Sequence, residues 1–600
     1  MQKAGNGTRS LNMDIELPDG IEMLYGDRLL ADVEEAARLP RRDCFASLKR
    51  YLGRPAGKLM LLNGLRRTGK TVMAKQAIAE LPDSKLESTV FLKASQDLVI
   101  PHRPVYDLVE ELYFDKKIRT FFIDECTALL EFPAWSKMMA DGPAARGCHV
   151  VLLGTDSLSM WIAERELLEG RYNEIRTTRI PFHEWKRLLK GSGVHLDVKD
   201  YIRYGGILDF DGVPTETALI AEARNSFRDP SSIAWYIHSS IALNIQNSLA
   251  RHAAGRDFGP LRMLWESGRL TEAIARIVQD QNHRLALNEL YVPYVFGDYY
   301  VARNVARELS DGIKKYFKNN GESLKKQINE RLCISNNQEE ILQITKKEVS
   351  LILRYLSRID VFRNADVRVM PSTVPEKRRG QLLYEESVRT LQTQPGIRAG
   401  QMNLACGVVW EVLKINQAPV SKEDFLKKAE ATVQGQMLED IVFADLQDVL
   451  PKDCRIFKLA WDADPGETAE FDCAVVDERD PGNPRVSLFE VKHTASSRGG
   501  PEKHMKNPRA IAQVAEAFGR VESRTIVYSG PTERRAVLWV NAGEFLESIG
   551  RDPEECLFPQ LSARWSPQVP FEPWLASAAD PACPAEEAPA PPGSEAMGTG

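Results

Sequence analysis

The sequence predicts a multidomain α/β protein with two sheet-containing regions and a largely helical region between them. The chain has 600 residues, which is too long for one hydrophobic core. Short apolar runs alternate with helical patterns over residues 21–185 and again over 431–550, as is typical of sheets covered by helices. Between these regions helical periodicity dominates.

The composition is that of an ordinary soluble protein, with 43% hydrophobic and 27% charged residues. The longest apolar runs are far shorter than the roughly 20 residues that cross a bilayer, and no basic-then-apolar signal opens the chain. Nine cysteines without a CxxC pair favour a reducing compartment. We therefore expect a cytoplasmic protein with no membrane partner. The net charge of −6 neither favours nor excludes nucleic acid.

Changes of composition predict seven segments. Residues 1–20 and 575–600 have the composition of disordered tails. Between them we expect, in order, an α/β domain at 21–185, a helical domain at 186–310, a winged-helix region at 311–375, a helical linker at 376–430 and a second α/β domain at 431–550.

A glycine-containing loop follows the first apolar run of the first α/β region. Gly64–Thr71 reads GLRRTGKT and matches GxxxxGK[ST], with an expected strand at 58–63 and a helical pattern after it. Glycines let backbone N–H groups turn towards phosphates at a helix N-terminus, Lys70 can reach the β- and γ-phosphates, and Thr71 can ligate Mg²⁺. The alternative is a turn with a surface lysine. The residues expected to bind ATP are Gly64, Arg67, Thr68, Gly69, Lys70 and Thr71.

Further apolar runs, at 89–93, 119–124 and 149–154, predict parallel strands. The second of them, RTFFIDE, delivers Asp124 and Glu125 to a strand end, where open α/β sheets bind ligands. Asp124 is expected to hold Mg²⁺ with Thr71, and Glu125 to act as the catalytic residue that polarises water, assisted by Lys70.

The last of these runs ends in Thr155, Asp156 and Ser157, at the place for a polar sensor of the γ-phosphate. A helix N-cap explains any one of these three residues equally well.

The motifs LLNGLRRTGKT, FFIDE, VVLLGTDS, EGRYNEIRTTRIPFHEW and YIRYGGI together resemble the AAA/STAND-related prokaryotic ATPases. The resemblance covers roughly residues 22–547. It implies an ASCE-type P-loop domain with a parallel sheet, then a helical and winged-helix region, and a restriction-endonuclease-like domain. An arginine that senses nucleotide or completes the site is also implied, with Arg171, Arg176 and Arg179 as candidates, and the alternative for each is an ordinary surface arginine. Whether the chain forms a homo-oligomer is left open by the sequence.

The middle region contains a capping-box pattern, Thr345 with Glu348 three residues later. It predicts a helix to about Ile359, and DVFRNADVRVM after it reads as a short β-ribbon. A helix followed by a ribbon favours a winged helix-turn-helix.

A paired charge on an apolar strand marks the second α/β region. Glu490 and Lys492 in LFEVK share one strand face, and Asp472 in EFDCAVV precedes them by 18 residues across a turn-rich segment. We expect the two strands to form a hairpin that brings these charges together. A charge on a strand covered on both faces is costly unless it is paired or bound to a metal. The alternative is a same-face ion pair on a solvated strand.

The pattern Glu439…Asp472…Glu490-x-Lys492 resembles the PD-(D/E)xK nuclease superfamily, although Phe471 stands where the signature proline would be. The resemblance implies that Asp472 and Glu490 ligate Mg²⁺, and Lys492 positions or deprotonates water. Glu439 is expected to steer the metal from a helix, and Gln513 to bind phosphate or water. All four charged residues are therefore candidate catalytic residues.

Basic clusters lie outside both sites. They are KKYFKNNGESLKK from Lys314, EKRRG with Lys377, Arg378 and Arg379, and Lys503, His504, Lys506 and Arg509. A charge run alone is usually a solvated helix face. Their positions favour DNA as a partner through salt-sensitive phosphate contacts.

These patterns lead to three hypotheses. The first is a Mg²⁺-dependent ATPase that controls a nucleic-acid-binding and nuclease module. The second is an ATP-dependent switch whose nuclease-like domain is inactive and only recognises a partner. The third is plain DNA-binding regulation by the winged helix.

Overall fold

The computed structural model describes residues 15–549 except 66, 96–97, 156, 178, 191–196, 207, 209–244, 246–247, 250–257, 275, 279–310, 332–344, 371–384, 393–394, 396–406, 462–469, 494–501, 503–504 and 536. The expected tail at 575–600, Asp156 and the basic residues at 377–379 and 503–504 lie outside the described residues. None of the helices in the described part of the chain has the length and apolarity to cross a membrane.

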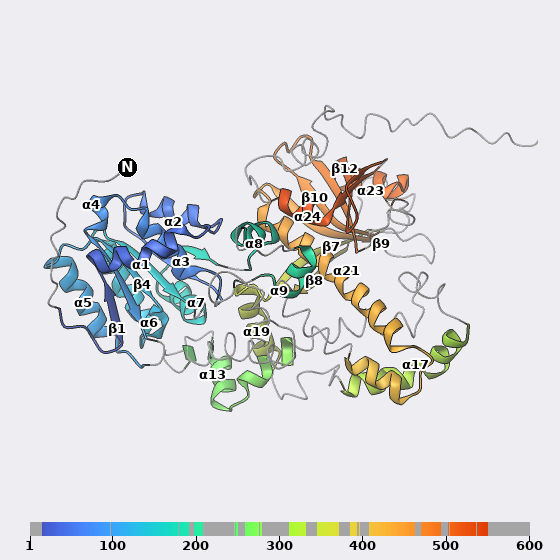
Figure 1. Ribbon diagram of the computed structural model, residues 1–600, viewed down its shortest axis with the longest axis horizontal. Coiled ribbons are helices and arrows are strands. Elements are labelled where there is room, and N and C mark those ends of the chain that lie inside the picture. Colours follow the sequence, from blue (N-terminus) through green and yellow to red (C-terminus); the bar gives the residue numbers. More distant parts are fainter. Residues whose placement is uncertain are drawn as a thin grey trace, which may run out of the picture.

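The first domain is a six-stranded sheet covered by helices on both faces (Figure 1). The strand order is β1-β3-β4-β5-β2-β6, and every pair is parallel except β1 with β3. The strands are β1 Ile21–Leu24, β2 Leu59–Asn63, β3 Thr89–Ala94, β4 Thr120–Asp124, β5 His149–Gly154 and β6 Tyr172–Arg176. The four predicted strands are confirmed, and β1 and β6 extend the sheet at its two edges.

The central strands of this sheet are buried on both sides, which explains why they read as unbroken apolar runs. Leu61 and Phe121 pack into one core cluster, whereas Leu62 and Phe122 pack into another. The helices are α1 Gly26–Arg38, α2 Phe45–Leu52, α3 Lys70–Ala79, α4 Asp83–Leu86, α5 His102–Phe114, α6 Phe132–Met139, the π-helix η2 Ala140–Ala144 and α7 Ser157–Glu166, with the short 3₁₀ turn η1 at Cys126–Ala128.

The described residues between α7 and β7 are mostly helical. Five of the helices are α8 Phe182–Leu188, α9 Val198–Tyr204, α13 Gly259–Glu266, α17 Asp311–Arg331 and α19 Lys346–Arg358. The predicted capping box is confirmed, because the Thr345 hydroxyl accepts from Glu348 N and the Glu348 carboxylate accepts from Thr345 N. α13 and α19 share a core cluster with Trp161 of α7, so the middle region packs directly on the first domain.

The second domain is an eight-stranded sheet with the order β13-β14-β12-β11-β10-β9-β7-β8. The strands are β7 Phe362–Met370, β8 Glu385–Gln392, β9 Cys454–Trp461, β10 Glu470–Asp477, β11 Arg485–Lys492, β12 Arg520–Tyr528, β13 Glu533–Arg534 and β14 Leu538–Asn541. The long helix α21 Lys422–Val449 contacts one side together with α24 Ala542–Ser548, and α23 Pro508–Phe518 packs on the other (Figure 1).

Two expectations for the region before this domain need correction. β7 is the predicted ribbon strand and pairs antiparallel with β8, but it also pairs in parallel with β9 and so extends the second sheet. The expected helical linker at 376–430 contains strand β8, Glu385–Gln392. Local patterns could not reveal that β7 joins the second sheet, because its parallel partner β9 lies about ninety residues further along the chain.

Candidate functional site

The phosphate-loop motif folds as a tight turn between β2 and α3. Gly64 has a φ of +145°, and a Cβ atom there would lie 2.3 Å from the carbonyl oxygen of Thr177. Gly69, just before α3, has a φ of +84°. Both positions therefore need glycine, the first because Thr177, just after β6, lies against it and the second because of its left-handed backbone.

Lys70 begins α3 and its side chain folds back over the loop. Its ammonium donates to the carbonyl oxygens of Gly64 at 3.0 Å and Leu65 at 2.8 Å, and the residue is only 6% exposed. Thr68 is fully buried, and its hydroxyl donates to Leu65 O at 2.8 Å. The loop thus holds a cation at the start of a helix, which is a suitable arrangement for phosphate oxygens.

Thr71 and Asp124 meet beside the loop. The Thr71 hydroxyl donates to Asp124 Oδ2 at 2.8 Å, and Asp124 Oδ1 accepts from Glu125 N at 2.9 Å. Burial raises the pKa of Asp124, Glu125 raises it further, and the Thr71 hydrogen bond lowers it. A hydroxyl and a buried carboxylate are the hard oxygen donors that Mg²⁺ prefers, so these residues fit the metal.

Glu125 directly follows the β4 strand end with a φ of +51°, a left-handed backbone that is costly for a residue other than glycine. Its Oε2 accepts a hydrogen bond from the Thr155 hydroxyl at 3.2 Å. Thr155 follows β5, and Ser157 is buried at the start of α7. β5 lies between β2 and β4, so it brings the predicted sensor residue Thr155 to Glu125.

One buried residue of this site was missed by sequence reasoning. Arg42, between α1 and α2, donates to the Thr68 carbonyl oxygen at 2.5 Å and pairs with Glu184 of α8 at 2.5 Å. Both side chains are at least nine-tenths buried. Glu184 lies within the PFHEW motif, so this acid could have been singled out from the sequence. Arg42 lies in no such motif.

The three candidate arginines differ in their surroundings. Arg171 pairs with Asp141 at 3.0 Å and Arg176 with Glu174 at 2.7 Å, and both are partly exposed. Arg179 is fully buried and cannot be the nucleotide-sensing arginine, because its guanidinium is held by carboxylates of α21.

The Arg179 contacts join the first domain to the second. Its guanidinium donates to Asp445, to Asp448 at 2.8 Å and to the Tyr201 hydroxyl at 3.0 Å, and its backbone N–H donates to Asp360. These carboxylates hold the pKa of Arg179 far above its usual range despite its burial. We call Arg179 with Asp360, Asp445 and Asp448 the arginine clamp.

The clamp residue Arg179 lies two residues after Thr177, which contacts the phosphate loop. Thr177 donates from its backbone N–H to Asn63 O at 2.7 Å, and its hydroxyl lies 2.7 Å from the Thr68 hydroxyl. The P-loop residue Arg67 also accepts a backbone hydrogen bond from Leu208 N at 2.8 Å. The segment after β6 therefore touches the loop at one end and α21 at the other.

The predicted hairpin of the second domain is confirmed, with Cys473 paired to Phe489. Asp472 Oδ2 accepts from Val491 N at 2.6 Å, and Lys492 Nζ lies 2.8 Å from Glu490 Oε1 and 3.7 Å from Asp472 Oδ2. A register shift in the β9–β10 pairing falls between Phe471 and Ala474, a bulge that spans Asp472. Bulges of this kind re-aim side chains at functional sites.

Glu490 is the least satisfied member of this group. It is 5% exposed, and its Oε2 is buried with no hydrogen-bond partner among the described residues. Burial raises the pKa of Glu490 to about 8, with a further increase from Asp472 and an opposing effect of Lys492. An orphaned carboxylate oxygen next to a second acid fits a divalent cation.

The residues around Asp472 and Glu490 support only some of the roles expected at this site. Glu439 of α21 is close enough to raise the pKa of Glu490, but within the described ranges no group of three or more His, Cys, Asp or Glu side chains forms a metal-binding cluster. Gln513 of α23 accepts a hydrogen bond from Trp461 Nε1 at 2.6 Å. Phe471 is fully buried in the core under α23.

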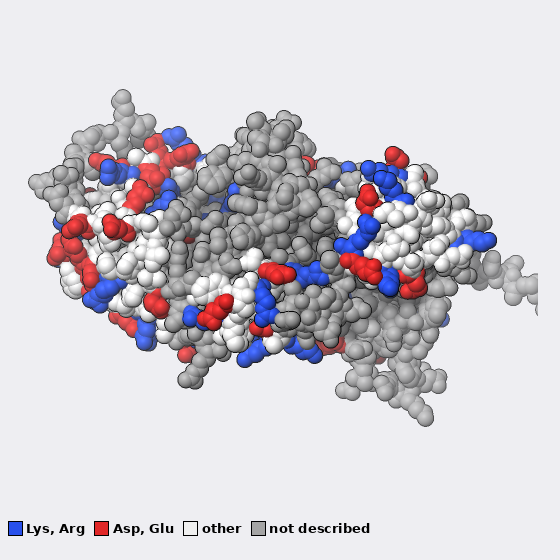
Figure 2. Space-filling view, turned by 90° about the horizontal axis from the view of Figure 1, so that it is seen from below, with Lys and Arg blue, Asp and Glu red and all other residues white. Residues whose placement is uncertain are grey.

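The basic cluster on α17 differs from the expectation in one respect. Its two aromatic residues are engaged inside the protein: Phe317 is buried in the core and the Tyr316 hydroxyl donates to Asn416 O at 2.6 Å. Lys506, in the third cluster, pairs with Glu502 at 3.0 Å. Figure 2 shows Lys and Arg side chains interspersed with Asp and Glu on the face it displays. Charge on that face does not single out a nucleic-acid surface.

Comparison with known proteins identifies one domain. A family model described as an AAA domain matches residues 56–186. No curated protein matches the sequence. This match, together with the loop geometry above, makes the first domain an AAA-type ATPase domain, which supports ATP binding and hydrolysis.

A comparison with solved structures gives only distant matches. The S. cerevisiae Hsp104–ADP complex is 14% identical, with a TM-score of 0.23 over 70% of this chain and 58% of that chain. C. elegans PCH-2 is 17% identical, with a TM-score of 0.17 over 40% and 63%. The Aeropyrum pernix ORC1 protein in complex with DNA is 13% identical, with a TM-score of 0.22 over 64% and 98%. This chain covers less than two thirds of the first two proteins, and TM-scores this low support no argument about fold or function.

Proposed function

We propose that this protein is a Mg²⁺-dependent ATPase whose nucleotide state controls a C-terminal module that binds and cleaves nucleic acid. The observation that carries the ATPase part is the contact of Thr71 with Asp124 beside a closed GxxxxGKT loop, with Glu125 next in the chain. In this arrangement the phosphate-binding group follows β2, and the metal-holding and water-activating groups lie at the end of β4, on the other side of β5.

The roles of the ATPase residues follow from their positions. Lys70 leaves the Gly64 and Leu65 carbonyls to bind the β- and γ-phosphates, and the loop amides bind the remaining phosphate oxygens. Thr71 and Asp124 would hold Mg²⁺, which neutralises phosphate charge. Glu125 orients the attacking water and accepts its proton, and the Thr155 hydroxyl fixes the Glu125 carboxylate.

The arginine clamp supports control of the second domain by the first. Thr177 contacts the phosphate loop, and Arg179 is bound to α21, which also carries Glu439. A shift of the loop on nucleotide binding would therefore reach α21 through three residues of chain. The buried charges of the clamp cannot separate cheaply, so the two ends are expected to move together.

The hairpin acids support phosphodiester cleavage. Asp472 and Glu490 would hold Mg²⁺, which polarises the scissile phosphate and acidifies water. Lys492 offsets the charge that develops on the phosphate, from its place between the two acids. DNA is the proposed partner, and a cytoplasmic location and a homo-oligomer remain proposals that come with this function.

Two assays test this function. ATP turnover by the purified chain should be abolished in Lys70→Ala, because the phosphate loses its cation. Plasmid and single-stranded DNA should be cleaved with Mg²⁺ by the unmodified protein and not by Glu490→Ala. Normal ATP turnover in Lys70→Ala contradicts the ATPase proposal. DNA cleavage by Glu490→Ala that equals cleavage by the unmodified protein contradicts the nuclease proposal.

A second candidate is a switch whose C-terminal domain recognises a partner without cleaving. One observation favours it: only two carboxylates, Asp472 and Glu490, meet at Lys492, and Glu439 does not complete a metal cluster within the described residues. Absence of Mg²⁺-dependent cleavage, together with retained ATP turnover, would select this candidate.

A further inference from the structure

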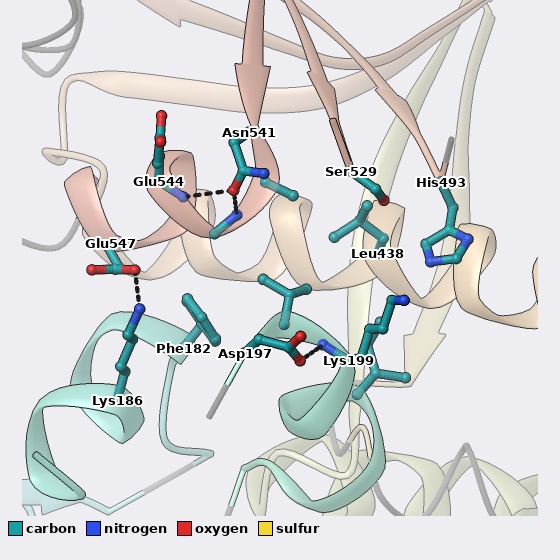
Figure 3. A pocket seen from close by; sticks show the side chains of 14 residues that line it. Phe182, Lys186, Asp197, Lys199, Leu438, His493, Ser529, Asn541, Glu544 and Glu547 are labelled. Atoms are coloured by element: carbon teal, nitrogen blue, oxygen red, sulfur yellow. Dashed lines mark hydrogen bonds and ion pairs between the residues drawn. The ribbon is translucent and has the colours of Figure 1, made fainter. Parts of the chain in front are cut away.

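Two cavities of the molecule differ in the charges that line them. The first, of about 300 Å³, lies between α8, α9 and the second domain (Figure 3). Its lining contains the carboxylates of Asp197, Glu544 and Glu547 against the ammonium groups of Lys186 and Lys199, so it does not favour an anion. The second, of about 630 Å³, lies in the AAA-type domain and has the opposite balance of charge.

The second cavity lies between α2 and the β2–β6 edge of the first sheet. Its floor is apolar, since Met60 of β2 and Ile175 of β6 are buried in the core cluster under α2. Residues 54–58, which connect α2 to β2, form its rim. The Tyr51 hydroxyl donates to Lys58 O at 2.8 Å and so ties the end of α2 to the start of β2. The core of the domain therefore holds this cavity in shape.

Three cations line this second cavity: Arg50, Arg54 and Lys58. All three residues are exposed, and none of them has an ion pair with any residue that the structure describes. Ser47 and Asn173 add a hydroxyl and an amide to the lining, groups that also donate to phosphate oxygens in protein–DNA complexes. The lining therefore combines positive charge that no acid balances with neutral hydrogen-bond donors. We call this site the basic cavity.

Among the described residues that line the basic cavity, Glu174 is the one carboxylate, and its charge is already balanced. Its Oε1 accepts from Arg176 Nε at 2.7 Å, from Arg358 Nη2 at 2.9 Å and from the Asn63 amide at 2.9 Å. Arg358 also pairs with Glu164, so two acids face two arginines. The three cations at the rim are left without counter-charge, and they favour an anionic ligand.

The basic cavity is separate from the phosphate loop. Lys58 precedes β2 and Gly64 follows it, so about 16 Å of strand separates this cation from the loop. Arg54 O lies 2.8 Å from Nε2 of His149, the first residue of β5, which places the rim at the amino ends of the parallel strands. ATP on the loop lies at their carboxyl ends, so the basic cavity takes a different anion.

The exposure of the cations favours an extended ligand over a small one. A pocket for one small anion encloses its charged groups, whereas these three side chains lie at an open rim. Tyr51 is the one aromatic residue among the described lining residues, and it is buried under α2, so no ring is offered to a nucleic-acid base. Contacts with a nucleic acid would therefore go to phosphates, which carry no sequence information.

We propose that the basic cavity binds the phosphate groups of a nucleic-acid strand, so that the AAA-type domain holds the DNA on which the second domain acts. The inference rests on the proposed function, because it takes DNA as the partner, and it adds a contact surface on the ATPase domain. Recognition through phosphates predicts binding that is independent of base sequence and weakens steeply as the salt concentration rises.

Binding of a short fluorescein-labelled single strand to the full chain, measured by anisotropy with EDTA to prevent cleavage, tests the proposal over a range of salt concentrations. The cavity variant Arg50→Ala/Arg54→Ala/Lys58→Ala removes three phosphate contacts. Each contact contributes about 0.7 to the slope of log affinity against log salt, so the slope should fall by about 2 and affinity at about 0.1 M salt by about 100-fold. Arg50→Lys with Arg54→Lys keeps the charges and should keep the slope; a slope lost here too contradicts a role of charge.

The matched control removes three cations of the same domain outside the cavity lining, Arg28→Ala/Lys116→Ala/Lys117→Ala. It should keep both the slope and the affinity of the unmodified protein. Basal ATP turnover should be unchanged in the cavity variant and in the control, because neither alters the phosphate loop or the end of β4, and this measurement shows that both variants are folded.

Equal slopes for the unmodified protein, the cavity variant and the control overturn the proposal. Displacement of the strand by micromolar inorganic tripolyphosphate assigns the basic cavity to a small anion and overturns it as well. The nuclease proposal fails separately. Cleavage that depends on Glu490, with binding that the cavity variant does not affect, removes the basic cavity and keeps the nuclease. A reduced slope in the cavity variant, with no cleavage by the unmodified protein, keeps the basic cavity and removes the nuclease.

Discussion

The two charged sites of this chain differ in how completely their partners are assembled. At the phosphate loop, Lys70, Thr71, Asp124 and Glu125 each have a hydrogen-bond partner within the site. In the hairpin, Glu490 keeps one buried oxygen without a partner in the described residues. The first site is pre-organised by the protein itself, whereas the second needs something from outside to complete it.

The largest expected effect lies at the pre-organised site. Glu125→Gln keeps the side-chain shape and the contact with Thr155 but removes the proton acceptor. ATP turnover should fall by at least about 100-fold, the usual contribution of a positioned base. Turnover measured by phosphate release, alongside binding of a fluorescent ATP analogue, separates this loss from a loss of affinity. A variant that neither binds nor turns over ATP would instead give Glu125 a structural role.

The hairpin site gives the next effect and tests whether an outside cation completes it. Lys492→Ala and Glu490→Ala should each lower Mg²⁺-dependent DNA cleavage by about 100-fold or more, because charge stabilisation at the phosphate is lost. The matched control is Lys452→Ala, an exposed lysine between α21 and β9 that belongs to none of the basic clusters. Equal cleavage by the unmodified protein, both hairpin variants and the control would mean that the hairpin site is not a catalytic site.

The arginine clamp connects the two sites and should affect stability before activity. Arg179→Met leaves Asp445 buried without its cation, so unfolding should become easier by about 3–5 kcal/mol. Arg171→Met removes a pair in which both side chains are nearly half exposed and should change stability by less than about 0.5 kcal/mol. Urea unfolding of both variants measures the difference. Similar losses of unfolding free energy in the two variants would mean that the clamp stabilises the protein no more than a surface ion pair does.

The smallest effect concerns Gln513, which the sequence assigned to phosphate or water. Trp461→Phe removes the indole N–H that donates to Gln513 and should cost about 1 kcal/mol. If the amide serves the hairpin site, Gln513→Ala should lower cleavage while Trp461→Phe, measured in the same assay, lowers only stability. Cleavage that is unchanged in Gln513→Ala would make this residue part of the core alone.

Local patterns predicted the parts of the molecule that local chemistry determines. The strands before Gly64 and Asp124 were evident from apolar runs, and the Asp472–Glu490 hairpin from the turn between its strands. β6 was missed because Tyr172–Arg176 is an edge strand with charged residues at alternate positions, and β9 because Cys454–Trp461 mixes charged and apolar residues. The contact of Arg179 with Asp445 spans 266 residues, and no sequence pattern links the two.

The length of α21 has a consequence for how the molecule works as a whole. Glu439 and Asp445 lie on one uninterrupted helix, about 9 Å apart along its axis. The part of α21 from Met437 to Val449, which carries both acids, packs against the sheet. A displacement of Asp445 would therefore move Glu439 by nearly the same amount, which would link the hairpin acids to the segment after β6 that contacts the phosphate loop.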